Sequence, residues 1–343
     1  MDKREAMLSF LVIGCGSIGS RHADNLLILG QTVYIYDREP ERMKEFIRTH
    51  PTAQVFDFKS HHLKIDAWVI ATPPNYHIPF SFEALSHDIK GIFIEKPISH
   101  NLDKVDETIN QAKEKGLVIQ VGYQFRFHPG LQLAKKLLDE GKIGKLLSIR
   151  AEFGQYLPNW HPNEDYRNLY TCHEQMGGGI LLESSHEIDY VRWLAGEVTK
   201  VSCFAGKVSN LDIDVEDTAD ILLYINTGII GNIHVDMIQQ FYTRYCKLIG
   251  EEGNILWEYP NYQVQVSRKT ANGGHVIINE PIAKSDYPDI NFNADMYLEE
   301  MRHFVACVEG KEKPVVDAET GKRVLEIALA AKESARENKV VEV

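Results

Sequence analysis

Short apolar runs alternate with amphipathic segments along the first third of the chain. The apolar runs predict strands at Leu8–Ile13, Thr32–Tyr36, Ala53–Phe56, Ala67–Ala71, Gly91–Ile94 and Leu117–Val121. The helical spacing of the other apolar residues predicts helices at Ser17–Leu29, Glu39–Arg48, Tyr76–Leu85 and Leu102–Lys115. Strands that alternate with helices of about 10–15 residues are typical of a parallel, doubly wound sheet.

The pattern changes after residue 123. A strand at Lys145–Phe153 is followed, between Val198 and Arg268, by strand after strand with turn signals between them, which indicates an open, mostly antiparallel sheet. Helices are predicted at Leu131–Glu140, Ile180–Leu194, Met296–Glu309 and Ala318–Glu337. We therefore predict an α/β domain over residues 1–123 and an α+β domain over residues 124–343, with a C-terminal helix free to pack back on the first domain.

Length, charge and cysteine content narrow the possible partners. The 343 residues suffice for two domains, since a domain typically has about 100–200 residues. The net charge of −12 disfavours nucleic acid and gives no reason to expect a membrane surface as a partner. No apolar stretch reaches the length of about 18 residues that a transmembrane helix needs. The five cysteines show no C-x-x-C spacing, so we expect a reduced, cytoplasmic protein without disulfides or a metal site.

A glycine-rich turn follows the first predicted strand. It reads Gly14, Cys15, Gly16, Ser17, Ile18 and Gly19, and it opens the first predicted helix. In a Rossmann domain such glycines allow a tight turn, close approach of a pyrophosphate and helix–sheet packing, while the helix N-terminus offers free N–H groups. Asp37 ends the second strand, where a carboxylate accepts hydrogen bonds from ribose hydroxyls and repels a 2′-phosphate. We predict NAD binding, with NADP less favoured, and Arg38 placed to stack on the adenine or to soften that preference.

The crossover after the fourth strand is the next candidate. Parallel sheets bind ligands at the carboxyl ends of their strands, and Thr72, Pro73, Asn75 and His77 follow such an end. In one interpretation these residues line the dinucleotide site, with Thr72 capping the next helix. In the other they form only a rigid turn with Asn75 as the helix N-cap.

Glu95 and Lys96 end the following strand, close to the expected nicotinamide position. A positively charged nicotinamide ring disfavours the ammonium form of a neighbouring lysine, which lets Lys96 share a proton with a substrate hydroxyl. An isolated lysine is usually just solvated, so this interpretation needs further motifs.

Those motifs occur along the whole chain. The nucleotide turn, Thr72–His77 and Glu95-Lys96-Pro97 are followed by Tyr123–Pro129, Gly177-Gly178-Gly179, His186–Asp189 and Gly310–Pro314. This order resembles the Gfo/Idh/MocA family, the glucose-fructose oxidoreductase and inositol dehydrogenase group. The resemblance implies that Lys96 touches the reacting hydroxyl and that the Lys96–Pro97 bond is cis.

The resemblance also implies a histidine acid/base on the helix after the glycine break, and His186 matches it. A neutral imidazole suits this task, although a lone histidine on an apolar helix is more often a core residue. Many family members carry an aspartate one helical turn earlier, where this chain has Leu182. The nearest acid is Glu183, which a continuous helix places on the same face as His186. Glu183 is then a candidate for substrate binding, for orienting His186 or for a cap, and Asp189 is an alternative orienting group.

The substrate-binding candidates mix aromatic and polar side chains, which suits a carbohydrate. They are Tyr123, Arg126, Tyr156, Trp160, Arg167, Glu183 and Asp189. Arg126 and Arg167 also suit a carboxylate or phosphate on the substrate. The alternative interpretation of the irregular stretch before Gly177 is a surface loop packed on a partner subunit.

We predict an NAD-dependent oxidoreductase that acts on a secondary or anomeric hydroxyl of a sugar or polyol. The first alternative is an epimerase, lyase or transhydrogenating enzyme with tightly bound, recycled NAD. The second is a dinucleotide-binding regulator without turnover. An antiparallel sheet with one uncovered face favours a homodimer or homotetramer.

Overall fold

The structure is a computed structural model that describes residues 7–58, 63–259, 261, 263–270, 272–282 and 292–343. The chain forms two compact units. The first comprises the residues up to Gln124 together with Asn293–Lys322, and the second comprises Phe125–Phe292 together with Arg323–Val343. The segment 293–322 therefore belongs to the first unit. The sequence pattern instead predicts one continuous second domain over residues 124–343.

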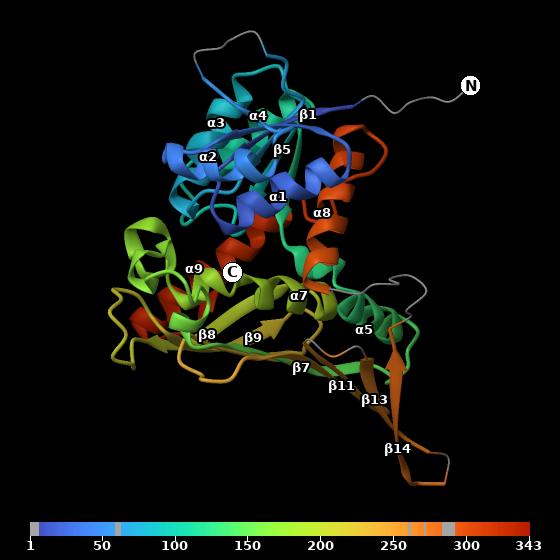
Figure 1. Cartoon of the computed structure of the whole chain (residues 1–343). Coiled ribbons are helices and arrows are strands. Elements are labelled where there is room, and N and C mark those ends of the chain that lie inside the picture. Colours follow the sequence, from blue (N-terminus) through green and yellow to red (C-terminus); the bar gives the residue numbers. More distant parts are fainter. Residues whose placement is uncertain (1–6, 59–62, 260, 262, 271, 283–291) are drawn as a thin grey trace, which may run out of the picture. The chain divides into compact units, whose positions relative to one another are not determined.

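The first unit contains a six-stranded parallel sheet (Figure 1). Its strands are β1 (Ser9–Ile13), β2 (Thr32–Tyr36), β3 (Gln54–Val55), β4 (Ala67–Ile70), β5 (Gly91–Glu95) and β6 (Val118–Gly122). Its helices are α1 (Ser17–Ile28), α2 (Pro40–Thr49), α3 (His77–Leu85), α4 (Val105–Glu114) and α8 (Phe292–Val308). The strand order β3-β2-β1-β4-β5-β6 is that of a Rossmann fold, which confirms the predicted doubly wound sheet.

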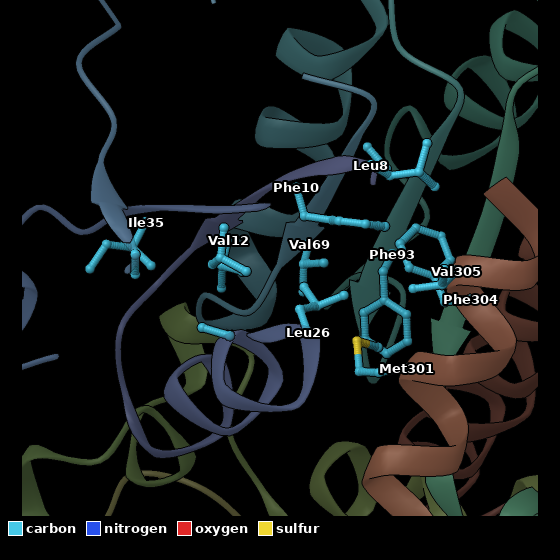
Figure 2. Packing of buried hydrophobic residues seen from close by; sticks show 14 of the residues in the cluster. Leu8, Phe10, Val12, Leu26, Ile35, Val69, Phe93, Met301, Phe304 and Val305 are labelled. Carbon is cyan, nitrogen blue, oxygen red and sulfur yellow. The ribbon is translucent and has the colours of Figure 1, made fainter. Parts of the chain in front are cut away.

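The core of this unit explains why α8 returns to it. Figure 2 shows Met301, Phe304 and Val305 of α8 packed with Phe10 of β1 and Phe93 of β5. The ring of Phe304 lies edge-on to the rings of Phe10 and Phe93, at centroid distances of 6.1 and 5.5 Å. Because aromatic rings remove large apolar areas from water, this contact holds α8 on the sheet.

The second unit is built on a nine-stranded sheet, in the order β14-β13-β12-β11-β7-β10-β9-β8-β15. The strands are β7 (Leu146–Gly154), β8 (Val198–Gly206), β9 (Thr218–Ile225), β10 (Ile230–Asp236), β11 (Thr243–Gly250), β12 (Gly253–Glu258), β13 (Gln263–Lys269), β14 (His275–Pro281) and β15 (Val341–Glu342). β7 and β10 pair in parallel, and the other described pairs are antiparallel. The sheet is therefore mostly antiparallel, as predicted, and continues past Arg268 into β14.

The helices of the second unit are α5 (Pro129–Asp139), α6 (Ile180–Glu183), α7 (Ser185–Ala195) and most of α9 (Ala318–Glu337). The single helix predicted over Ile180–Leu194 is wrong, because the backbone breaks at Ser184, which has φ −92° and ψ 28°. Serine is a weak helix former, and Ser184 is followed by a second serine. The break matters because Glu183 and His186 then lie on different helices.

The irregular stretch before Gly177 folds into four short 3₁₀ turns. They are Leu157–Asn159, Tyr166–Asn168, Tyr170–Cys172 and Glu174–Met176. Another turn, Gln124–Phe127, leads into α5. All five cysteines are buried free thiols, and burial raises the pKa of Cys15, Cys203 and Cys307 to about 12. No helix in the described residues is both long enough and apolar enough to cross a membrane.

Candidate active site

The glycine turn of the first unit leaves room for a dinucleotide. Gly14 has φ +95°, and a Cβ there would lie 2.4 Å from the carbonyl oxygen of Ala71. A Cβ on Gly19 would lie 1.8 Å from the oxygen of Gly14, so helix α1 packs against the turn only without a side chain. In front of Gly16 the space is open apart from Arg42, whose Nη1 is 3.8 Å from a Cβ at this position. Gly16 caps α1 without a side-chain bond, which leaves its first N–H groups for a phosphate.

Asp37 is nearly buried beside this turn. Its Oδ2 accepts a hydrogen bond from the Cys15 N–H at 2.7 Å, and its Oδ1 accepts one from the Glu39 N–H at 2.8 Å. Since each carboxylate oxygen accepts more than one bond, the fixed carboxylate retains capacity for ribose hydroxyls. The side chain of Arg38 is exposed, and its Nε lies 3.9 Å from Oε1 of Glu39. The turn and Asp37 together fit the adenosine and diphosphate parts of NAD.

His77 holds the β4 crossover together. Its ring is fully buried, with Nε2 2.8 Å from the Thr72 carbonyl oxygen and Nδ1 2.8 Å from that of Pro97. Burial lowers the pKa of His77, although both carbonyl contacts oppose this. Pro73 caps the short 3₁₀ turn Pro74–Tyr76, and neither Thr72 nor Asn75 serves as the predicted cap. His77 therefore ties the crossover to the Lys96–Pro97 bond, which is cis as predicted.

A buried histidine–carboxylate pair precedes that bond. His22 of α1 places Nε2 2.6 Å from Oε1 of Glu95, and the other carboxylate oxygen accepts the Lys96 N–H at 3.1 Å. Lys96 itself is partly exposed. Sequence reasoning missed His22, although it lies on the buried stripe of α1 with Gly19, Ala23 and Leu26.

The second unit carries the candidate acid/base. His186 lies at the start of α7 with 5% of its surface exposed, and the Phe125 ring meets it edge-on at 5.1 Å. Glu183 lies at the end of α6, where its Oε2 accepts a hydrogen bond from the Tyr170 hydroxyl at 2.6 Å. The predicted shared helical face of Glu183 and His186 is thus wrong, and Tyr170 holds Glu183 instead.

Arg126 and Asp189 bind each other rather than presenting free charges. Nε and Nη2 of Arg126 donate to the two carboxylate oxygens of Asp189 at 2.7 and 2.8 Å, and both side chains are buried. The guanidinium also lies over the Trp193 ring, 4.9 Å from its centroid. The pair occupies Nε and Nη2 of Arg126 and both oxygens of Asp189. The substrate contact of Arg126 and the orienting role of Asp189 stay predictions.

A second buried ion pair involves the residue next to His186. Nε of Arg244 is 3.0 Å from Oε1 of Glu187, the residue after His186. The Arg244 guanidinium lies between the rings of Phe125 and Phe153, at 4.5 and 4.0 Å from their centroids. Sequence reasoning missed Glu187, Arg244 and Phe125, because only the fold brings β11 beside the 3₁₀ turn and α7.

The remaining substrate candidates are three aromatic side chains and Arg167. Tyr123 is fully buried in the first unit, while Tyr156 and Trp160 are half-buried in the second. The Trp160 indole N–H donates to the Gln155 carbonyl at 3.0 Å. Arg167 is exposed, and its guanidinium binds both oxygens of Asp165. Among the described residues, no cluster of three or more histidine, cysteine or carboxylate side chains is arranged to hold a metal.

Two family models match the chain, one in each unit. Residues 8–123 match the model described as "Oxidoreductase family, NAD-binding Rossmann fold", and residues 131–256 match the "GFO/IDH/MocA C-terminal domain". The chain belongs to the GFO/IDH/MocA oxidoreductase family. Its first unit is therefore the NAD-binding domain of this family, in agreement with the open glycine turn and the fixed Asp37.

Relatives within the GFO/IDH/MocA family match almost the whole chain. Myo-inositol 2-dehydrogenase of Thermotoga maritima is 27% identical, over 97% of each chain. The scyllo-inositol 2-dehydrogenase (NAD(+)) of Bacillus subtilis is 28% identical, over 97% of this chain and 95% of its own. A solved structure of levoglucosan dehydrogenase in complex with NADH has a TM-score of 0.86, with 22% identity over 98% of this chain and 99% of that one. At this identity the structural likeness supports the fold alone.

Proposed function

We propose that this protein is an NAD-dependent dehydrogenase that oxidises a secondary or anomeric hydroxyl of an uncharged sugar or polyol. The observation that carries the proposal is the match to two inositol dehydrogenases across 97% of the chain. The open glycine turn and Asp37 support it from the structure.

The chemistry divides between cofactor and protein. Bound nicotinamide supplies the acceptor for the hydride. We assign Lys96 and His186 to hold the reacting hydroxyl and to take up its proton. Imidazole is an effective general base near neutral pH, and a nearby nicotinamide cation would disfavour the ammonium form of the lysine. Lys96 is anchored through its backbone N–H on Glu95, and the ring of Phe125 supports His186.

Three paired arginines of the second unit favour an uncharged substrate. Arg126 is paired with Asp189, Arg244 with Glu187 and Arg167 with Asp165. Withdrawing the first two from their carboxylates would leave buried charges uncompensated, which costs several kcal/mol, about 3–5 in typical cases. Glu183 and Tyr170 offer instead an acceptor and a hydroxyl of the kind that suits substrate hydroxyls.

The test is NADH formation, measured by absorbance, from NAD+ with inositols, neutral sugars, uronic acids and sugar phosphates. We expect a rate with a neutral cyclic polyol or sugar. Lys96→Met and His186→Ala should each lower kcat about 10²–10⁴-fold, while Lys90→Met, on an exposed lysine paired with Asp66, serves as the control. Turnover at the wild-type rate in both active-site variants would contradict the assignment. Silence across the panel, with NAD already bound to the purified protein, would favour the recycled-cofactor alternative.

We also propose that the protein is a cytoplasmic homodimer or homotetramer assembled through the uncovered face of its large sheet. This face exposes Phe204, Leu222, Tyr224 and Ile230, which are 75, 51, 47 and 60% exposed. The strand register places them on one face of β8, β9 and β10. A Leu222→Lys, Tyr224→Lys double variant should yield a smaller species in light scattering, and a wild type that is already monomeric would refute the proposal. Five buried free thiols are consistent with a reducing compartment.

A further inference from the structure

The buried pair of His22 and Glu95 lies at the nicotinamide end of the first unit's sheet. Glu95 is the last residue of β5, and ligands of parallel sheets bind at the carboxyl ends of their strands. His22 is fully buried and Glu95 is 6% exposed, so solvent screens neither group. The contact between Nε2 and Oε1, at 2.6 Å, is one of the shortest in this unit.

Several neighbours fix the carboxylate of Glu95 in place. A Cβ on Gly122 of β6 would lie 3.1 Å from Oε1 of Glu95, so the glycine leaves the space that the carboxylate occupies. The His22 ring is wedged edge-on between Phe93 and Tyr297, at centroid distances of 5.0 and 6.1 Å. The carboxylate thus has one preferred orientation, with one oxygen on His22 and the other on the Lys96 N–H.

The hydrogen bonds of the pair engage one nitrogen of the His22 ring and both oxygens of Glu95. Nδ1 of His22 is buried without a hydrogen-bond partner among the described residues. Nε2 of His22 and the Lys96 N–H each contact one oxygen of the Glu95 carboxylate.

Two other titratable groups face Glu95, Lys96 beside it and His77 at the start of α3. His77 lies within electrostatic range of both residues. Burial lowers the pKa of His77, which disfavours the charged form of this ring. Lys96 carries the cationic group of this set and is partly exposed.

We propose that the carboxylate of Glu95, oriented by His22, makes the protein bind NAD+ more tightly relative to NADH. The inference rests on the proposed function, because it takes NAD as the cofactor. The nicotinamide ring is positively charged in NAD+ and neutral in NADH, so a fixed anion near it stabilises the oxidised form selectively. His22 is a positioning residue that acts through Glu95.

The test measures the dissociation constants of NAD+ and NADH by titration calorimetry, without any sugar. Glu95→Gln and His22→Leu should each raise the ratio Kd(NAD+)/Kd(NADH) about fivefold or more. His22→Gln should keep the wild-type ratio, because its amide N–H replaces the ring donor. His50→Leu is the matched control, since His50 follows the end of α2, pairs with Asp24 and has no contact with Glu95 in the described residues.

Unchanged ratios in Glu95→Gln and His22→Leu would overturn the inference. If His22→Leu does not fold, the isosteric Glu95→Gln variant decides alone. A wild type that binds neither dinucleotide would overturn the proposed function as well. Normal binding with an unchanged ratio would overturn only the role of Glu95, and a shifted ratio in a protein without sugar turnover would support Glu95 while contradicting the proposed function.

Discussion

At the scale of single residues, two buried ion pairs hold charged side chains of the second unit. Arg126 with Asp189 and Arg244 with Glu187 place two ion pairs inside the fold, close to the helix that carries His186. Buried pairs of this kind contribute little net stability, but removing one partner is costly because the other charge stays behind. Because each pair joins one cation and one anion, the two pairs add no net charge to the surroundings of His186.

Arg244 provides the test of this view. Arg244→Met should lower the free energy of unfolding by about 3–5 kcal/mol, because Glu187 would remain buried without its partner. Thermal and urea unfolding followed by circular dichroism measure the change. Arg167→Met, which breaks only an exposed pair, should leave the free energy of unfolding nearly unchanged. Similar losses in both variants would argue against a special role of the buried pair.

At the scale of elements, the sequence predicts most of the Rossmann unit because its strands are continuous apolar runs between glycines and helices. The same reasoning fails at Ser184, where a helical pattern continues across a backbone break. It also cannot assign α8 to the first unit, since an amphipathic helix does not specify which sheet it covers. Pairs such as Arg126–Asp189 and His22–Glu95 join residues far apart in sequence, and only the fold creates them.

The glycine turn gives a prediction at this scale. In Gly19→Ala the added methyl group would collide with the Gly14 carbonyl oxygen, so α1 must move away from the turn. Overpacking of this kind costs about 1–3 kcal/mol, and we expect the Kd for NAD+ to rise about tenfold or more, measured by calorimetry. Gly206→Ala adds its methyl group in open space and should leave the Kd unchanged. Wild-type affinity in Gly19→Ala would contradict the assigned role of the turn.

At the scale of the whole molecule, the open face of the large sheet carries a pH-sensitive group. His234 of β10 lies between Asp220 and Asp236, with its ring nitrogens 3.1 and 3.2 Å from their carboxylates. The hydrogen bond with Asp236 is the largest of the influences that raise the pKa of His234 to about 9. The protonated ring thus joins strands β9 and β10 across the neutral range.

Stability should therefore depend on alkaline pH. A histidine with a raised folded-state pKa contributes its full stabilisation below its unfolded pKa of about 6.5. It loses this contribution as the pH rises through about 9. The melting temperature of the wild type should fall between pH 7 and pH 10, and His234→Gln should flatten this decline. An equally steep decline in the variant would assign the pH dependence to other groups.

The buried cysteines have a practical consequence for spectroscopy. Reactivity belongs to the thiolate, and burial raises the pKa of all five thiols. A maleimide fluorophore should therefore react first with a cysteine engineered on the surface, for example at the exposed Glu41 of α2. The natural chain can serve as its own background for such labelling, without replacement of any native cysteine, and the dye would report nucleotide binding beside the glycine turn.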